Sequence, residues 1–193
     1  SDIAKSGNGQ ILYSSGTDDI INKIRDILEP PDPEKKIDLI LTIDATASMA
    51  DDIKSLRSLL PPLLEELLSE YSAYRVGLVL YKDYNDEFWS KSLPVRTFPF
   101  TSNFREFSRS LDSFRVYGGR DITEAVYEAL YASLVFYDWD PDAIKRVILI
   151  GDAEPHPVPR GSGLYSKDLI DSLIVEKDAE VDVIVLMEKT SPN

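Results

Sequence analysis

The chain of 193 residues contains no cysteine. This absence excludes disulfides, thiolate metal ligands and thiol redox chemistry, but it leaves the compartment open because secreted proteins need not contain disulfides. Basic residues are scarce, with 21 Lys and Arg against 34 Asp and Glu and a formal net charge of −13. That charge argues against nucleic acid and anionic membrane surfaces as partners. It fits cations or basic proteins, although an acidic solvated surface is its commoner cause.

Long hydrophobic runs and low-complexity tracts are also absent. No apolar run reaches the length of a membrane span, and the chain does not begin with a signal peptide. Because it starts at Ser1 without Met, we expect a processed or recombinant fragment, and the missing targeting segment says little. With 43% hydrophobic residues, the chain can bury a core as one domain spanning residues 1–193.

Apolar segments and helical periodicity alternate along the chain. Their pattern predicts strands at 37–43, 75–81, about 93–99, 146–151 and 181–187, and helices at about 49–71, 103–114, 122–136 and 166–176. This alternation favours an α/β fold, with a mainly parallel sheet covered by helices on both faces. Ser102 and Ser166 are predicted helix caps, and Pro61-Pro62 is expected to kink or split the first long helix.

The most informative segment follows the first predicted strand and reads Asp44-Ala-Thr46-Ala-Ser48. Side chains at alternate positions can converge on one point, and hard cations such as Mg²⁺ prefer carboxylate, hydroxyl and water oxygens. The segment therefore predicts a cation site. The alternative is that Ser48 caps the next helix, with Asp51 in its first turn.

Three further segments follow in order: Tyr81-Lys-Asp83-Tyr, Gly118-Gly-Arg-Asp121-Ile-Thr123-Glu124, and Gly151-Asp152-Ala-Glu-Pro-His156. With the first segment, they resemble the von Willebrand factor A family over essentially the whole chain. The resemblance implies a three-layer, doubly wound, Rossmann-like fold and a metal-ion-dependent adhesion site (MIDAS). Mg²⁺ is the expected ion, and the sequence does not separate it from Mn²⁺ or Ca²⁺.

Carried over position by position, the resemblance implies the metal ligands Asp44, Thr46, Ser48, Asp121 and Asp152, the last through water. Thr123 is the alternative ligand if Asp121 does not bind the metal. Asp83 either holds the metal ligands in place without binding the metal, or caps a turn. Asp121 stands where the family usually has Thr; it could instead cap a helix with Glu124 as its capping-box partner. As a third carboxylate, Asp121 would favour holding the metal over gripping an acidic partner. His156 is interpreted as part of a rigid surface loop.

The family's last strand and last helix have no counterpart after Met187. Residues 3–13 look like that strand, and residues 17–28 look like that helix, with Thr17 as its cap. The hypothesis is a circular permutation: 1–28 supply the last strand and helix, 29–36 form a linker, and 37–193 form the core. The alternatives are the tail of a preceding tandem domain or an element exchanged in a swapped dimer.

These observations predict a non-enzymatic, divalent-metal-binding module for protein interaction or cell adhesion. Its partner would offer an acidic side chain or a polar loop over the cation. The rival hypothesis is a metal-dependent hydrolase or phosphotransferase, but Asp44 has no second acid two residues later and no Gly-rich, Lys-containing phosphate loop is present. A third is a structural domain with an empty site. The resemblance favours an extracellular or cell-envelope location, while a cytoplasmic one stays open.

Overall fold

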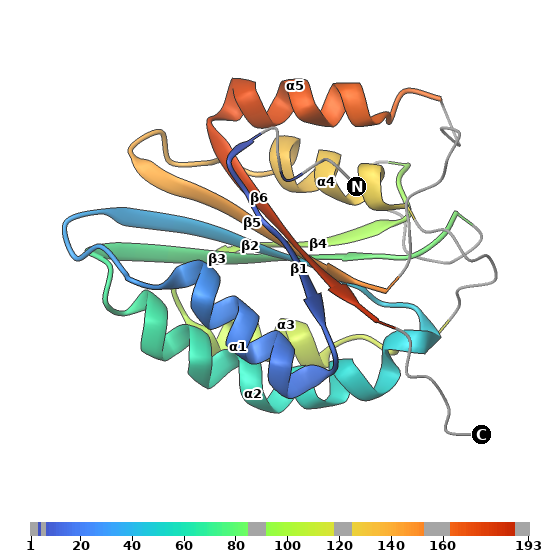
Figure 1. Ribbon diagram of the computed structural model, residues 1–193, viewed down its shortest axis with the longest axis horizontal. Coiled ribbons are helices and arrows are strands. Elements are labelled where there is room, and N and C mark those ends of the chain that lie inside the picture. Colours follow the sequence, from blue (N-terminus) through green and yellow to red (C-terminus); the bar gives the residue numbers. More distant parts are fainter. Residues whose placement is uncertain (1–3, 5–6, 85–91, 118–124, 153–162, 188–193) are drawn as a thin grey trace.

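The central strands of the sheet are almost continuously apolar, which is typical of strands covered on both faces. The computed structural model describes residues 4, 7–84, 92–117, 125–152 and 163–187. Six strands form one sheet in the order β1-β6-β5-β2-β3-β4 (Figure 1). Their bounds are β1 Ile11–Ser14, β2 Lys36–Asp44, β3 Ala73–Tyr81, β4 Val95–Thr101, β5 Ala143–Gly151 and β6 Ala179–Leu186. Only the pairing of β3 with β4 is antiparallel.

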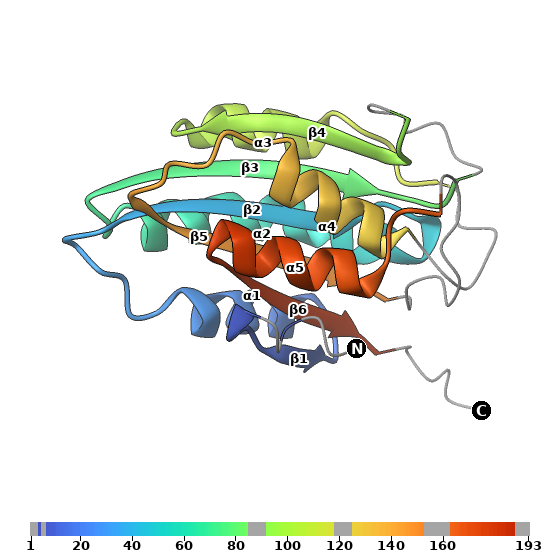
Figure 2. The same ribbon diagram turned by 90° about the horizontal axis from the view of Figure 1, so that it is seen from above.

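Helices cover both faces of this sheet. One face carries α1 (Thr17–Leu28), α2 (Ala50–Leu68) and α3 (Phe104–Asp112), and the other carries α4 (Val126–Val135) and α5 (Lys167–Lys177) (Figures 1 and 2). A buried apolar cluster fills each of the two interfaces. The predicted three-layer, mainly parallel α/β fold is therefore confirmed.

The register of the sheet brings three strand ends together. Asp44, the last residue of β2, pairs with Tyr81, the last residue of β3. On the other side of β2, Ile43 pairs with Ile150, so that Gly151 at the end of β5 lies beside Asp44. Because these strands are parallel, the loops after all three begin at the same edge of the sheet.

The N-terminal segment lies within this molecule's own sheet, as the fold prediction required. β1 pairs in parallel with β6, from Ile11 opposite Val183 to Ser14 opposite Leu186. α1 then packs beside α2 (Figure 1), and Arg146 of β5 donates a hydrogen bond to the carbonyl of Ile27. The segment thus supplies the edge strand and a covering helix. Whether a permutation produced this order, or a second copy can exchange the segment, stays a hypothesis.

Several local predictions were wrong, because contacts distant in sequence decide them. α2 runs unbroken through Pro61-Pro62, since the leucines on both sides of the pair are buried and hold the helix against the sheet. The N-cap of α3 is Asn103, whereas the Ser102 hydroxyl donates to the carbonyl of Tyr74. Thr17 is the first residue of α1 and donates to Asp52 rather than capping the helix. The predicted cap Ser166 is confirmed by its hydrogen bond from the Leu169 amide.

An irregularity between β3 and β4 is filled by a tyrosine from the segment after α4. The register shifts between Val76 and Leu78, and the Tyr137 hydroxyl lies 2.9 Å from the Leu78 carbonyl oxygen and 2.6 Å from that of Phe98. A Cβ at Gly77 would lie only 2.8 Å from the Tyr137 ring. Glycine is therefore required where the ring crosses β3.

We expect Tyr137→Phe to destabilise the protein by about 1–3 kcal/mol, because it removes the hydroxyl that donates to the carbonyl groups of Leu78 and Phe98. Urea unfolding monitored by circular dichroism measures this change. Tyr13→Phe is the matched control, since the Tyr13 side chain is 60% exposed and should leave the midpoint unchanged. Equal midpoints for both variants would show that the Tyr137 hydroxyl does not support the bulge.

Candidate metal centre

Asp44 is the innermost residue of the candidate site and has no exposure to solvent. Its Oδ1 accepts two hydrogen bonds from Thr46, one from the amide at 2.8 Å and one from the hydroxyl at 2.6 Å. The Ser48 hydroxyl lies 3.2 Å from the Thr46 hydroxyl. Since Thr46 donates to Asp44, Ser48 donates to Thr46 in this chain of bonds. The structure thus brings the three predicted oxygen ligands of the first loop together.

The other carboxylate oxygen of Asp44 is buried, and no described residue donates a hydrogen bond to it. A buried polar atom of this kind is costly unless a proton or a cation reaches it. Burial raises the pKa of Asp44 to about 7, opposed by the two Thr46 bonds and assisted by repulsion from the neighbouring carboxylate of Asp152. Two carboxylates this close to each other are a natural place for a divalent cation.

Ser48 is not used as a helix cap. Residues Ala47–Met49 form a short 3₁₀ turn, and α2 begins after Met49 with no side-chain hydrogen bond at its N-cap. The capping alternative for Ser48 is therefore wrong. Its side chain is exposed, and its hydroxyl lies beside that of Thr46.

The second loop could not be placed, because Asp121, Thr123 and Glu124 lie outside the described residues. Both flanks of that loop nevertheless meet at Lys82. The Tyr117 ring lies over the Lys82 ammonium, with 3.1 Å between Nζ and the ring centroid, and the Ala125 amide donates to the Lys82 carbonyl at 3.4 Å. Lys82 directly follows Tyr81, whose carbonyl accepts from the Ala45 amide at 2.9 Å. Tyr117 and Ala125, which flank the second loop, thus both contact Lys82, the residue after Tyr81, and Tyr81 pairs with Asp44.

The third loop begins at the predicted place. Asp152 follows β5 directly and is half-buried, while His156 lies outside the described residues. A cavity of about 330 Å³ opens beside this point, lined by Ser15, Gly16, Ser48, Asp51, Asp52, Asp152, Leu186 and Met187. Two of the predicted ligands, Ser48 and Asp152, thus share one solvent-accessible space.

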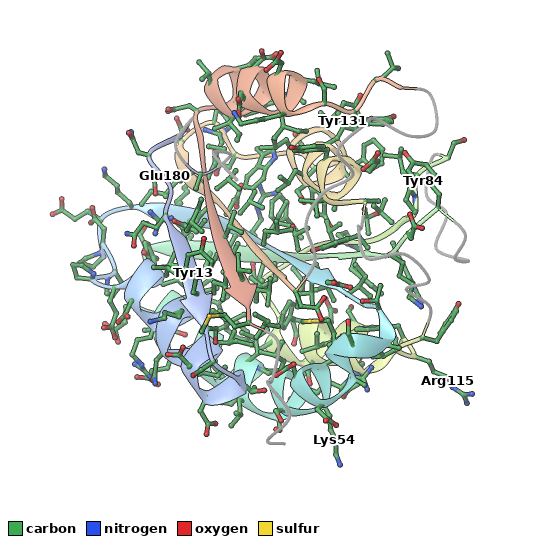
Figure 3. The ribbon with its side chains drawn as sticks, turned by 45° about the vertical axis from the view of Figure 1, so that its right-hand side comes forward. Tyr13, Lys54, Tyr84, Arg115, Tyr131 and Glu180 are labelled. Atoms are coloured by element: carbon green, nitrogen blue, oxygen red, sulfur yellow. The ribbon has the colours of Figure 1, made fainter. Side chains whose placement is uncertain are left out.

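The segment after β3 is more deeply buried than its sequence indicated. Lys82 is fully buried and Asp83 is 1% exposed. The Tyr84 hydroxyl donates to the buried carboxylate of Glu128 in α4 at 2.8 Å, on the face of the sheet that also carries Tyr131 (Figure 3). Sequence reasoning selected only Asp83 from this segment, and its supporting role stays a prediction. Lys82 and Glu128 were missed because charged residues are normally exposed, so no sequence signal marked them.

The donor set determines which kind of ion could bind. Among the residues that the structure places, no group of three or more His, Cys, Asp or Glu could hold a metal ion. The oxygen atoms that the described residues offer at this edge are the carboxylates of Asp44 and Asp152 and the hydroxyls of Thr46 and Ser48. None of the described helices is long and apolar enough to span a membrane.

Comparisons with known proteins agree with this fold. No family model matches the chain. Integrin beta-5 of Bos taurus is 26% identical over 145 residues, a match that covers 62% of this chain and only 18% of integrin beta-5. An aerotolerance-related membrane protein from Bacteroides fragilis has a TM-score of 0.52 at 17% identity, covering 77% of this chain and 67% of that protein. The pilus adhesin SpaC from Lactobacillus rhamnosus GG has a TM-score of 0.46 at 17% identity, covering 62% and 15%.

The likeness to the Bacteroides protein shows a shared fold. The chain spans less than a fifth of the length of integrin beta-5.

We expect the contribution of Asp44 to the stability of the metal-free protein to fall as pH rises from about 4 to about 7. The pKa of Asp44 is raised on folding, so that the folded state binds more protons than the unfolded state in this window, and each rise in pH favours unfolding. Above about pH 7 both states are ionised at this residue and the slope vanishes.

Urea unfolding in the presence of chelator at several pH values tests this expectation. Asp44→Asn should reduce the dependence of the unfolding free energy on pH. Some dependence should remain in both proteins, because burial also raises the pKa of Asp182. Identical pH profiles for wild type and Asp44→Asn would contradict it.

Proposed function

We propose that this chain is a non-enzymatic protein-interaction module that binds a divalent cation at a MIDAS-like site. The observation that carries the proposal is the buried carboxylate of Asp44, with one oxygen held by Thr46 and the other lacking a described donor beside Asp152. In this proposal Asp44, Thr46 and Ser48 bind the ion directly, and Asp152 binds it through water.

Mg²⁺ fits this donor set best, because all of the proposed ligands are hard oxygen atoms. Mn²⁺ and Ca²⁺ accept the same atoms and should compete. We further propose Asp121 as a ligand, supported by its place in the sequence and by the anchoring of Tyr117 and Ala125 at Lys82. Three carboxylates would more than balance a divalent charge, so the site should retain its metal better than it grips an acidic partner.

The partner that we propose is a protein surface that completes the shell of the cation with an acidic side chain or a polar loop. Ser48 is exposed at the site, and the adjoining cavity leaves that side open to solvent. The partial sequence match to integrin beta-5 supports an adhesion-type role and an extracellular or cell-envelope location. The net charge of −13 makes a partner with basic groups around the contact favourable at long range.

Calorimetric titration of Mg²⁺, and then Mn²⁺, into chelator-treated protein tests the metal site. We expect one saturable site in the wild type and a loss of at least about tenfold in affinity in Asp44→Asn, because the buried ligand loses its charge. Asp26→Asn, an exposed acid on α1, is the matched control and should bind like the wild type. A wild type that binds neither ion would overturn the proposal.

Asp121→Ala in the same titration decides the role of that residue. Loss of binding would make Asp121 a ligand, whereas unchanged affinity would identify it as a helix cap.

The enzymatic alternative predicts Mg²⁺-dependent release of phosphate from a simple phosphate ester. We expect no release above that of Asp44→Asn, because Asp44 has no second acid two residues later and the sequence has no Gly-rich, Lys-containing phosphate loop. Metal-dependent turnover that disappears in Asp44→Asn would show that the module is an enzyme.

A further inference from the structure

A buried tyrosine lies beneath the candidate metal centre. Tyr81 is the last residue of β3, is 1% exposed and pairs directly with Asp44. Its side chain belongs to the same apolar cluster as Val79 and Ile40, on the face covered by α4 and α5. Asp44 lies four residues after Ile40 and therefore points to the same face. The phenol and the carboxylate are thus neighbours on one side of the sheet.

The hydroxyl of Tyr81 reaches the far side of Asp44. The strand order is β5-β2-β3, so Asp44 lies between Gly151 and Tyr81. A Cβ at Gly151 would nevertheless collide with the Tyr81 hydroxyl oxygen, and it would lie 3.3 Å from the Asp44 Cβ and 3.7 Å from Oδ2. The tyrosine ring therefore crosses the end of β2. Its hydroxyl occupies the space that a side chain at position 151 would need.

We propose that Tyr81 is a positioning residue of the metal site. Its hydroxyl, seated against Gly151, sets the spacing between the Asp44 carboxylate and the start of the loop that carries Asp152. A phenol suits this role because it is neutral: it can donate a hydrogen bond to an ionised acid or to the water between two acids without repelling the cation. This inference rests on the metal binding proposed above.

Packing alone does not explain the pair. Phenylalanine would fill the same apolar space without burying a hydroxyl group. Glycine at the end of a strand also costs conformational entropy on folding, and any other residue would displace the hydroxyl. The Tyr81 hydroxyl and Gly151 meet at the end of β5, directly before Asp152. This is the place that sets the spacing between Asp44 and Asp152.

The test compares Mg²⁺ titrations of the wild type, Tyr81→Phe and Tyr137→Phe. We expect Tyr81→Phe to weaken Mg²⁺ binding about tenfold or more, in the range found for residues that hold metal ligands in place. Tyr137→Phe removes another buried hydroxyl, far from the acids, and should bind Mg²⁺ like the wild type. Mg²⁺ should also change the tyrosine absorbance of the wild type and of Tyr137→Phe, but not that of Tyr81→Phe.

Gly151→Ala supplies an independent measurement. Alone it should lower both Mg²⁺ affinity and the urea midpoint, because the new methyl group displaces the Tyr81 hydroxyl. In the double variant Tyr81→Phe/Gly151→Ala the hydroxyl that collides with the new methyl group is gone. The loss of stability in the double variant should therefore be smaller than the sum of the losses in the two single variants.

The outcomes separate the two proposals. If the wild type binds Mg²⁺ and Tyr81→Phe binds it equally well, the positioning role is wrong while the metal site stands. If the wild type binds no Mg²⁺, the metal site and the positioning role fall together. Weakened binding in Tyr81→Phe with strict additivity in the double variant would overturn the seating of the hydroxyl against Gly151.

Discussion

A carboxylate buried at the end of an apolar strand costs several kcal/mol unless it is neutralised or hydrogen-bonded. Asp44 satisfies half of this requirement within its own loop, because Thr46 donates twice to one oxygen. The other oxygen has no donor among the described residues, and the nearby carboxylate of Asp152 raises the pKa of Asp44 further. A proton resolves the conflict at low pH, and a divalent cation would resolve it at neutral pH. The local arrangement of the site follows from this one constraint.

The sheet makes the constraint possible. Parallel strands with a common register end at one edge, so that residues distant in sequence begin their loops beside Asp44. The N-terminal segment completes the layer around that edge: β1 covers β6, and Thr17 at the start of α1 donates to Asp52 at the start of α2. Its position matters because the turn at Ser15 and Gly16 lines the cavity next to Ser48 and Asp152. A segment from the far end of the chain thus shapes the entrance to the candidate site.

Sequence reasoning succeeded where the signal was local. The apolar strand ending in Asp44-Ala-Thr46-Ala-Ser48 predicted both the strand and the convergence of three oxygen atoms. It failed at Pro61-Pro62 and at the caps of α1 and α3, because packing in those places outweighs local propensity. It also noted Tyr81 and Lys82 as part of a motif but assigned a role to neither. An apolar strand and a charged residue after it are ordinary in sequence, and only the pairing of β3 with β2 reveals that both lie at the edge of the candidate metal site.

The electrostatic balance at this edge limits what the module can do. A site built from Asp44 and Asp152 alone would just balance a divalent ion and leave it attractive to an acidic partner. With Asp121 as a third ligand, as we propose, the protein would hold the ion more tightly and attract such a partner less.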